Sequence, residues 1–102
     1  MTTIRCDRTP AWGELKKKFE LTGRQFDLRQ AFAADAHRFD ALSLQAPHVF
    51  ADLSKNLLDI DTRACLLELA QQCGLVAKRD AMFAGERINS TENRAVMHWL
   101  LR

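Results

Sequence analysis

The spacing of apolar residues is the feature that most constrains how this chain folds, because it follows a helical period almost everywhere. In the N-terminal part, apolar side chains recur three or four positions apart, which predicts helices with one apolar face. The first stripe contains Trp12, Leu15 and Phe19, and the second contains Leu28, Phe32, Ala36 and Phe39. Thr9 and Pro10 favour the start of the first helix. Gly23 favours its end, and Asp27 favours the start of the second helix.

The period changes once, in the segment that follows these two helices. Leu42 and Leu44 alternate with polar residues, and a weaker alternation resumes at Val49. This pattern predicts a short β-hairpin over 42–45 and 49–54, with Pro47 in the break between the strands. An isolated two-stranded hairpin is marginal in water, so we expect it to lie against the helices or to join a larger sheet.

Helical spacing then returns and continues to the last residue. Asp59 favours the start of a helix that runs through Cys73, and Gly74 is placed for a left-handed end. A shorter helix is predicted over 75–84, ended by Gly85. The fold class predicted for the chain is therefore mainly α with one short β-hairpin, an α+β arrangement.

A last helix is predicted over 92–102, with Ser90 and Thr91 available as caps. Its apolar face contains Val96, Trp99 and Leu100. A helix of roughly eleven residues is marginal without tertiary support, so we expect further protein to cover this face.

The composition indicates a globular protein and argues against several classes of function. Of the 102 residues, 47% are hydrophobic and 27% are charged, and the net charge is only +2. The one basic run consists of Lys16, Lys17 and Lys18 on a solvated helix face, so we expect no binding to nucleic acid. No stretch resembles a signal peptide or reaches the ~18 apolar residues of a membrane span, which favours a cytoplasmic protein without membrane contact.

The three cysteines do not form the dense, even set that a disulfide framework requires. Cys65 and Cys73 fall in one helical pattern, where cysteine acts as a small apolar residue, and Cys6 lies far from both. This usage favours a reducing compartment.

No motif of an active site is visible in these residues. His37, His48 and His98 have no His, Cys or acidic neighbour at the spacing of metal ligands, so we expect no metal and no cofactor. Arg94 and His98 lie one helical turn apart in the last predicted helix. Either they form a polar pair that faces a site, or His98 is an interior imidazole with a local partner or a surface residue.

Two stretches, however, closely resemble the glucose-6-phosphate isomerase family. They are DLSKN at 52–56 and MFAGERINSTENRAVMHWLLR from Met82 onward. The second contains a Met-Phe-x-Gly-Glu turn, an Ile-Asn step, a Thr-Glu helix start and an Arg-Ala-Val-x-His segment, in order and without gaps. The matching residues are Met82, Phe83, Gly85, Glu86, Ile88, Asn89, Thr91, Glu92, Arg94, Ala95, Val96 and His98. Looser agreement extends back to Pro10. Leu53, Ser90, Met97 and Trp99 depart from the family pattern as changes in packing.

The resemblance implies that 1–102 is the N-terminal segment of such an isomerase, with the remainder of the enzyme absent. It implies a helical shell that packs on a larger α/β/α sugar-isomerase fold. Family members interconvert glucose 6-phosphate and fructose 6-phosphate in glycolysis and gluconeogenesis by acid–base catalysis. They need no metal or organic cofactor, and they are homodimers.

The family's catalytic and substrate-binding groups lie beyond this chain, so no residue here is assigned to catalysis or to the sugar phosphate. Arg94 and His98 are the only candidates for contacting and orienting the catalytic residues without touching the substrate. We therefore expect the 102-residue chain to be structural and inactive alone. The alternatives are a stand-alone helical interaction module and, less favoured, a nucleic-acid binder that uses the lysine run.

Overall fold

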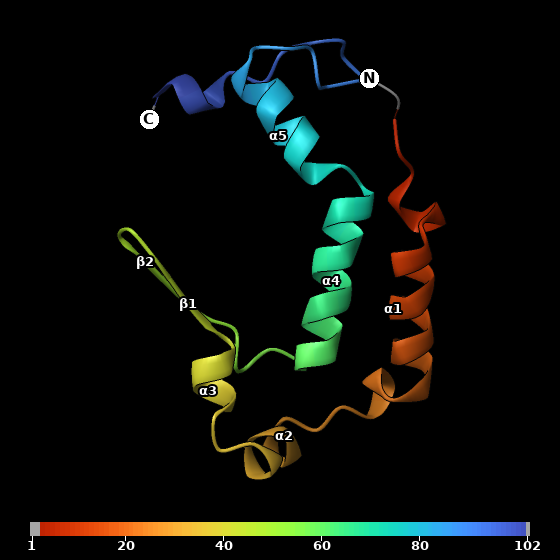
Figure 1. Cartoon of the computed structure of the whole chain (residues 1–102), viewed down its shortest axis with the longest axis vertical. Coiled ribbons are helices and arrows are strands. Elements are labelled where there is room, and N and C mark those ends of the chain that lie inside the picture. Colours follow the sequence, from red (N-terminus) through yellow and green to blue (C-terminus); the bar gives the residue numbers. More distant parts are fainter. Residues whose placement is uncertain (1–2, 102) are drawn as a thin grey trace.

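A computed structural model describes residues 3–101, and most of them lie in helices (Figure 1). The helices are α1 (Pro10–Leu21), α2 (Leu28–Ala34), α3 (Arg38–Ala41), α4 (Ile60–Gln72) and α5 (Leu75–Phe83), and the strands are β1 (Ser43–Ala46) and β2 (Val49–Asp52). Short 3-10 turns occupy Cys6–Arg8, Gly23–Gln25 and His98–Leu101. The predicted class, mainly α with one β-hairpin, is confirmed.

The main tertiary contact is the packing of α1 against α4, which lie side by side in Figure 1. At one end, the backbone N–H of Ala11 donates to Gln72 Oε1 at 2.8 Å. At the other end, Lys18 Nζ lies 3.9 Å from Asp59 Oδ1. The start of α1 therefore meets the end of α4, so the two helices run antiparallel.

Local capping explains where these helices begin and end. The Thr9 side chain accepts from the N–H of Trp12, and Asp59 accepts from the N–H of Thr62 at 2.6 Å. Gly74 has a φ of 71° and Gly85 a φ of 78°, in the left-handed region that favours glycine. The predicted starts at Thr9 and Asp59 and the predicted breaks at Gly74 and Gly85 are thus confirmed.

The end of α5 explains the Met-Phe-x-Gly-Glu turn in physical terms. The N–H of Gly85 donates to the Met82 carbonyl at 3.1 Å, and the N–H of Glu86 donates to the Ala81 carbonyl at 3.0 Å. These two bonds form a Schellman motif, which satisfies helix carbonyls that would otherwise lack partners.

The continuous helix predicted over the second apolar stripe is wrong. The chain leaves the helix at Asp35, whose backbone is extended at φ −138° and ψ 104°. Its carboxylate accepts from the N–H of His37 at 2.9 Å, which gives that N–H a partner outside a helix. The helix resumes only at Arg38, so α2 and α3 are separate elements.

The hairpin is confirmed, with slightly different bounds from those predicted. Ser43 pairs with Asp52 and Ala46 with Val49, which leaves Pro47 and His48 as the two-residue turn. His48 has a φ of 65°, and proline followed by a residue of positive φ is the pattern of a type II turn. In Figure 1 the hairpin projects away from the helices.

The helix predicted over 92–102 is also wrong for the described residues, and Arg102 lies outside them. Asn89 and Arg94 instead pair through their backbones, with N–O distances of 3.1 and 3.3 Å. The Asn89 side chain accepts from the N–H of Glu92 at 3.2 Å, in a turn where Asn93 has a φ of 54°. Asparagine thus gives the backbone an alternative to the helix that the apolar spacing favoured.

The pairing of Cys6 with Cys73 corrects the expectation that the cysteines are unpaired. The two sulfur atoms lie in bonding contact, and the Cα atoms are 5.6 Å apart. The residues are 67 positions apart, and the antiparallel packing of α1 on α4 brings them together. Sequence spacing alone gave no sign of this contact, whereas Cys65 is free as expected.

The chain forms a thin, open layer with little core. Its radius of gyration is 17.2 Å, against about 13 Å for a compact domain of this length. Its accessible surface is 8405 Å², against roughly 5,800 Å² for a compact monomer of this size. The shortest extent, 17 Å, is not much more than the ~10–12 Å diameter of one helix. Domains normally pack two layers around a core, and the described residues supply only one.

Large apolar side chains are exposed on every helix longer than one turn and on the hairpin. They include Trp12, Phe19, Phe32, Phe50, Leu67, Leu75 and Phe83. Among the described apolar residues, only Ala11, Leu42 and Ala81 are buried. None of the described helices is long and apolar enough to cross a membrane.

Candidate functional site

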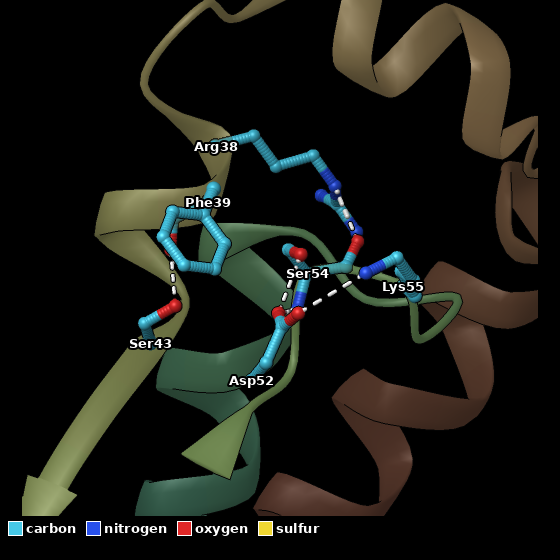
Figure 2. Close-up of polar contacts among 6 residues, drawn as sticks. All are labelled: Arg38, Phe39, Ser43, Asp52, Ser54 and Lys55. Carbon is cyan, nitrogen blue, oxygen red and sulfur yellow. Dashed lines mark hydrogen bonds and ion pairs between the residues drawn. The ribbon is translucent and has the colours of Figure 1, made fainter. Parts of the chain in front are cut away.

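The most buried polar cluster lies where α3, the base of the hairpin and the loop before α4 meet (Figure 2). We call it the Arg38 cluster, and it consists of Arg38, Asp52, Ser54, Lys55 and Asn56. Arg38 is only 5% exposed and Ser54 only 1% exposed. Charged side chains are almost never this buried unless they are paired, so the cluster is a candidate functional site.

Arg38 organises the cluster by binding two backbone carbonyls of the loop. Its Nε donates to the Ser54 carbonyl and its Nη2 to the Asn56 carbonyl, both at 2.9 Å. The guanidinium also lies 5.6 Å from the ring centroid of Phe26 and 5.4 Å from that of Phe32. These contacts compensate for burying the charge.

Asp52 fixes the same loop from the other side, as Figure 2 shows. Its Oδ1 accepts from both the backbone N–H of Ser54 at 2.9 Å and the Ser54 hydroxyl at 2.5 Å. Its Oδ2 lies 3.3 Å from Lys55 Nζ. The hydrogen bonds from Ser54, joined by the Lys55 charge, hold the pKa of Asp52 below its ordinary value.

The cluster continues into the helices on both sides. Arg63 Nη1, on α4, donates to the Ala41 carbonyl at the end of α3 at 2.6 Å. The backbone N–H of Leu53 donates to the Leu42 carbonyl at 2.9 Å, at the base of the hairpin. Partial burial acts to raise the pKa of Asp59, but the Thr62 N–H and the charges of Lys18 and Arg38 outweigh it and lower that pKa.

The chemistry of the cluster is that of a support and not of a reacting group. A hydroxyl beside a carboxylate has the residue types of a nucleophile and its base, but a nucleophile must reach its substrate. Ser54 is buried, and its hydroxyl is bonded to Asp52. Arg38 is directed at carbonyls of its own chain. The cluster therefore holds the hairpin in place relative to α4.

Two hollows on the described surface are mainly apolar. One of about 490 Å³ lies along α1 and is lined by Trp12, Leu15, Lys16 and Phe19. Another, of about 320 Å³, lies at the junction of α4 and α5 and includes Leu67, Leu75 and Val76. A site for a small polar ligand needs several convergent polar groups, and neither of these two hollows supplies them. A third hollow, of about 240 Å³, includes Lys18, Asp59 and Thr62, but Asp59 already accepts from the Thr62 N–H and lies 3.9 Å from Lys18 Nζ.

Arg94 and His98 do not share a helix, because the helix predicted to carry both is absent from the described part of the chain. Arg94 lies in the turn closed by Asn89, and its side chain is 75% exposed with Glu92 3.8 Å away. His98 begins the last 3-10 turn and is exposed. Their support of a catalytic site stays a prediction.

Sequence reasoning missed the role of Arg38. Its carbonyl partners lie 16 and 18 positions away. In the sequence it lies between Ala36 and Phe39 of the predicted apolar stripe, at a position where arginine normally faces solvent. The Asp-x-Ser spacing of the loop was a usable signal, because an Asp side chain often accepts from the N–H two residues on.

Comparison with known proteins gives these elements a family. A sequence model of phosphoglucose isomerase matches residues 52–102, which is half of the chain. Glucose-6-phosphate isomerase of Albidiferax ferrireducens is 69% identical over the whole chain, which covers 20% of that relative. The one from Polaromonas naphthalenivorans is 67% identical with the same coverage. The Saccharomyces cerevisiae enzyme is 43% identical over 91% of the chain, which covers 18% of it.

The chain therefore belongs to the phosphoglucose isomerase family. It spans about a fifth of the length of the curated relatives that it matches. The family match begins at Asp52 and includes the loop that Arg38 holds, the end of α5 and the turn around Asn89.

Proposed function

We propose that this chain forms the N-terminal part of a glucose-6-phosphate isomerase, which interconverts glucose 6-phosphate and fructose 6-phosphate in glycolysis and gluconeogenesis. The observation that carries the proposal is the 69% identity over the whole chain to a relative of that name. The role proposed for these residues is structural: they form a helical shell and hairpin that pack on a larger α/β/α fold. The thin layer and its exposed apolar faces support this role, because such faces need a second layer.

We also propose that the 102-residue chain has no isomerase activity alone. Acid–base isomerisation needs a positioned base, an acid for ring opening and a phosphate-binding group in one pocket. The buried polar groups described here, Arg38 and Ser54, are bonded within the chain, and the hollows along α1 and at the junction of α4 and α5 are mainly apolar. The complete enzyme is proposed to be a cytoplasmic homodimer that binds its sugar phosphate without a metal or organic cofactor.

A chimera tests both proposals. Residues 1–102 of this chain replace the corresponding fifth of the Albidiferax ferrireducens relative, and a coupled assay measures conversion of fructose 6-phosphate to glucose 6-phosphate. We expect the chimera to retain most of the relative's activity. The chain alone, and the relative without its first fifth, are both expected to be inactive.

Two results would contradict these proposals. A well-folded but inactive chimera would refute the family role of this segment. Turnover by the purified chain alone, scaling with its concentration in a host strain that lacks its own isomerase, would refute the claim of inactivity. Cooperative, monomeric unfolding of the chain alone would favour the alternative, a stand-alone helical interaction module.

Support of the catalytic site by Arg94 and His98 is a further part of the proposal. Both side chains are exposed among the described residues, so both are free to contact protein that completes the fold. In the chimera, His98→Asn is expected to lower kcat and to shift its pH profile, with KM unchanged. His48→Asn, on the hairpin turn, is the matched control. An unchanged profile would leave His98 with a packing role only.

A further inference from the structure

Cys6 and Cys73 meet at the end of the α1–α4 pair that carries the start of α1. Cys6 lies in the short turn before α1, and Cys73 directly follows α4. Their Cα atoms are 5.6 Å apart, near the commonest value for a disulfide. We propose that Cys6 and Cys73 form a reversible thiol–disulfide pair that locks the segment before α1 onto the end of α4.

The third cysteine, Cys65, cannot replace Cys6 as the partner of Cys73 in the folded chain. Cys65 lies on α4, eight residues before Cys73, and the helical rise separates the two by about 12 Å along the axis. A disulfide needs Cα atoms closer than about 7 Å. Cys65 is free and half-buried, which makes it a built-in control.

The bond acts at a place where few other contacts hold the two segments together. Beside it, the N–H of Ala11 donates to Gln72 Oε1 at 2.8 Å. The Ile4 side chain lies against Gly74, because its Cδ1 is 3.5 Å from where a Cβ on that glycine would stand. Closing a covalent loop of 67 residues here removes a large amount of freedom from the unfolded chain. The lock therefore strengthens the main helix pair when the thiols are oxidised.

The proposed oxidant is a small disulfide such as oxidised glutathione. One cysteine thiolate attacks the glutathione disulfide, forming a mixed disulfide and releasing one glutathione. The second cysteine then attacks the mixed disulfide and releases the other. Overall the two cysteines lose two electrons and two protons, and both pass to the two glutathione thiols. In a reducing compartment, pairs of this kind are transient and sense the redox state.

The first test follows which of these three cysteines pair in the chimera, where the rest of the relative completes the fold. In concentrated guanidinium chloride the chain is unfolded, and the shorter loop closes more easily. The ratio of the two loop lengths, raised to the power three-halves, favours Cys65–Cys73 over Cys6–Cys73 by about 24-fold. Without denaturant we expect Cys6–Cys73 to dominate instead. After digestion with trypsin, the disulfide of Cys6 joins the peptide CDR to the peptide ACLLELAQQCGLVAK. Fragmentation in a mass spectrometer then shows which of the two cysteines in the longer peptide is bonded. Mainly Cys65–Cys73 pairing without denaturant overturns the proposal.

The second test measures how strongly the folded chain favours the bond. Cys65→Ser leaves only the proposed pair, and Cys6→Ser removes it. Both substitutions are made in the chimera, which is equilibrated in glutathione buffers with and without denaturant. For Cys65→Ser we expect an oxidation constant roughly 30-fold or more larger without denaturant, in line with native disulfides. A constant equal to that of the denatured chain overturns the proposal. Cys6→Ser is expected to form no linked peptide pair containing residue 6.

Discussion

Replacing Arg38 by methionine should loosen the loop between the hairpin and α4. Methionine keeps much of the apolar stem, but it donates no hydrogen bond and removes the charge that lies near the rings of Phe26 and Phe32. Two charge-assisted bonds are lost, each worth about 1.5–3 kcal/mol. The Asn56 carbonyl belongs to an exposed residue and can bind water instead, whereas the Ser54 carbonyl is left without a partner in a buried residue. The expected cost is therefore about 2–4 kcal/mol, below the simple sum of the two bonds.

Native-state hydrogen exchange of the chimera measures this cost at the loop itself. The Leu53 amide is a suitable reporter, because it is bonded to the Leu42 carbonyl beside the cluster. A cost of about 2–4 kcal/mol predicts that its exchange becomes roughly 30- to 900-fold faster, up to the full protection of the parent chain. Arg29→Met on α2 is the matched control, since the Arg29 side chain is exposed.

The comparison of the two variants decides whether this reasoning is right. Arg29→Met should leave exchange at Leu53 unchanged, and Arg38→Lys should fall between the parent and Arg38→Met, because lysine keeps the charge but not the two-pronged geometry. Equal exchange rates in Arg38→Met and Arg29→Met would refute the idea that the guanidinium holds the loop.

Three further predictions concern the Asp59 cap, two glycines and the turn closed by Asn89. The pKa of Asp59 is lowered in the folded chain, so its stabilisation of α4 is full above about pH 5 and is lost as the pH falls below the ordinary value of 3.8. Circular dichroism across this range should show a step that Asp59→Asn, which still caps, lacks. Gly74→Ala should cost about 1–2 kcal/mol in urea denaturation because of its positive φ. Gly13→Ala, with nothing within 4 Å of the added Cβ, should instead stabilise α1 by up to about 1 kcal/mol; the reverse signs would contradict this account. Asn89→Ala should speed exchange of the Arg94 amide about fivefold by removing the side-chain bond that closes the turn, and unchanged exchange would show that the backbone pair suffices.

The sequence by itself determined the local structure wherever a residue satisfies its own neighbours. Thr9 and Asp59 cap helices with their side chains, and Gly74 and Gly85 end them through their backbone freedom. These bonds reach five residues at most, so the local pattern contains everything needed to predict them. The family could be identified from the sequence for a related reason, because the motif at the end of α5 is a continuous run of residues.

The tertiary structure alone decided which distant groups meet. Arg38 finds carbonyls 16 and 18 positions away, and Cys6 finds Cys73 across 67 positions. Periodicity also failed where two local patterns competed: Asp35 and Asn89 favoured turns through their side chains, while the apolar spacing around them favoured helices. The turn prevails at these places because the described residues supply no second layer to bury the apolar face. A helix in such a segment gains too little from packing to outweigh a side-chain bond.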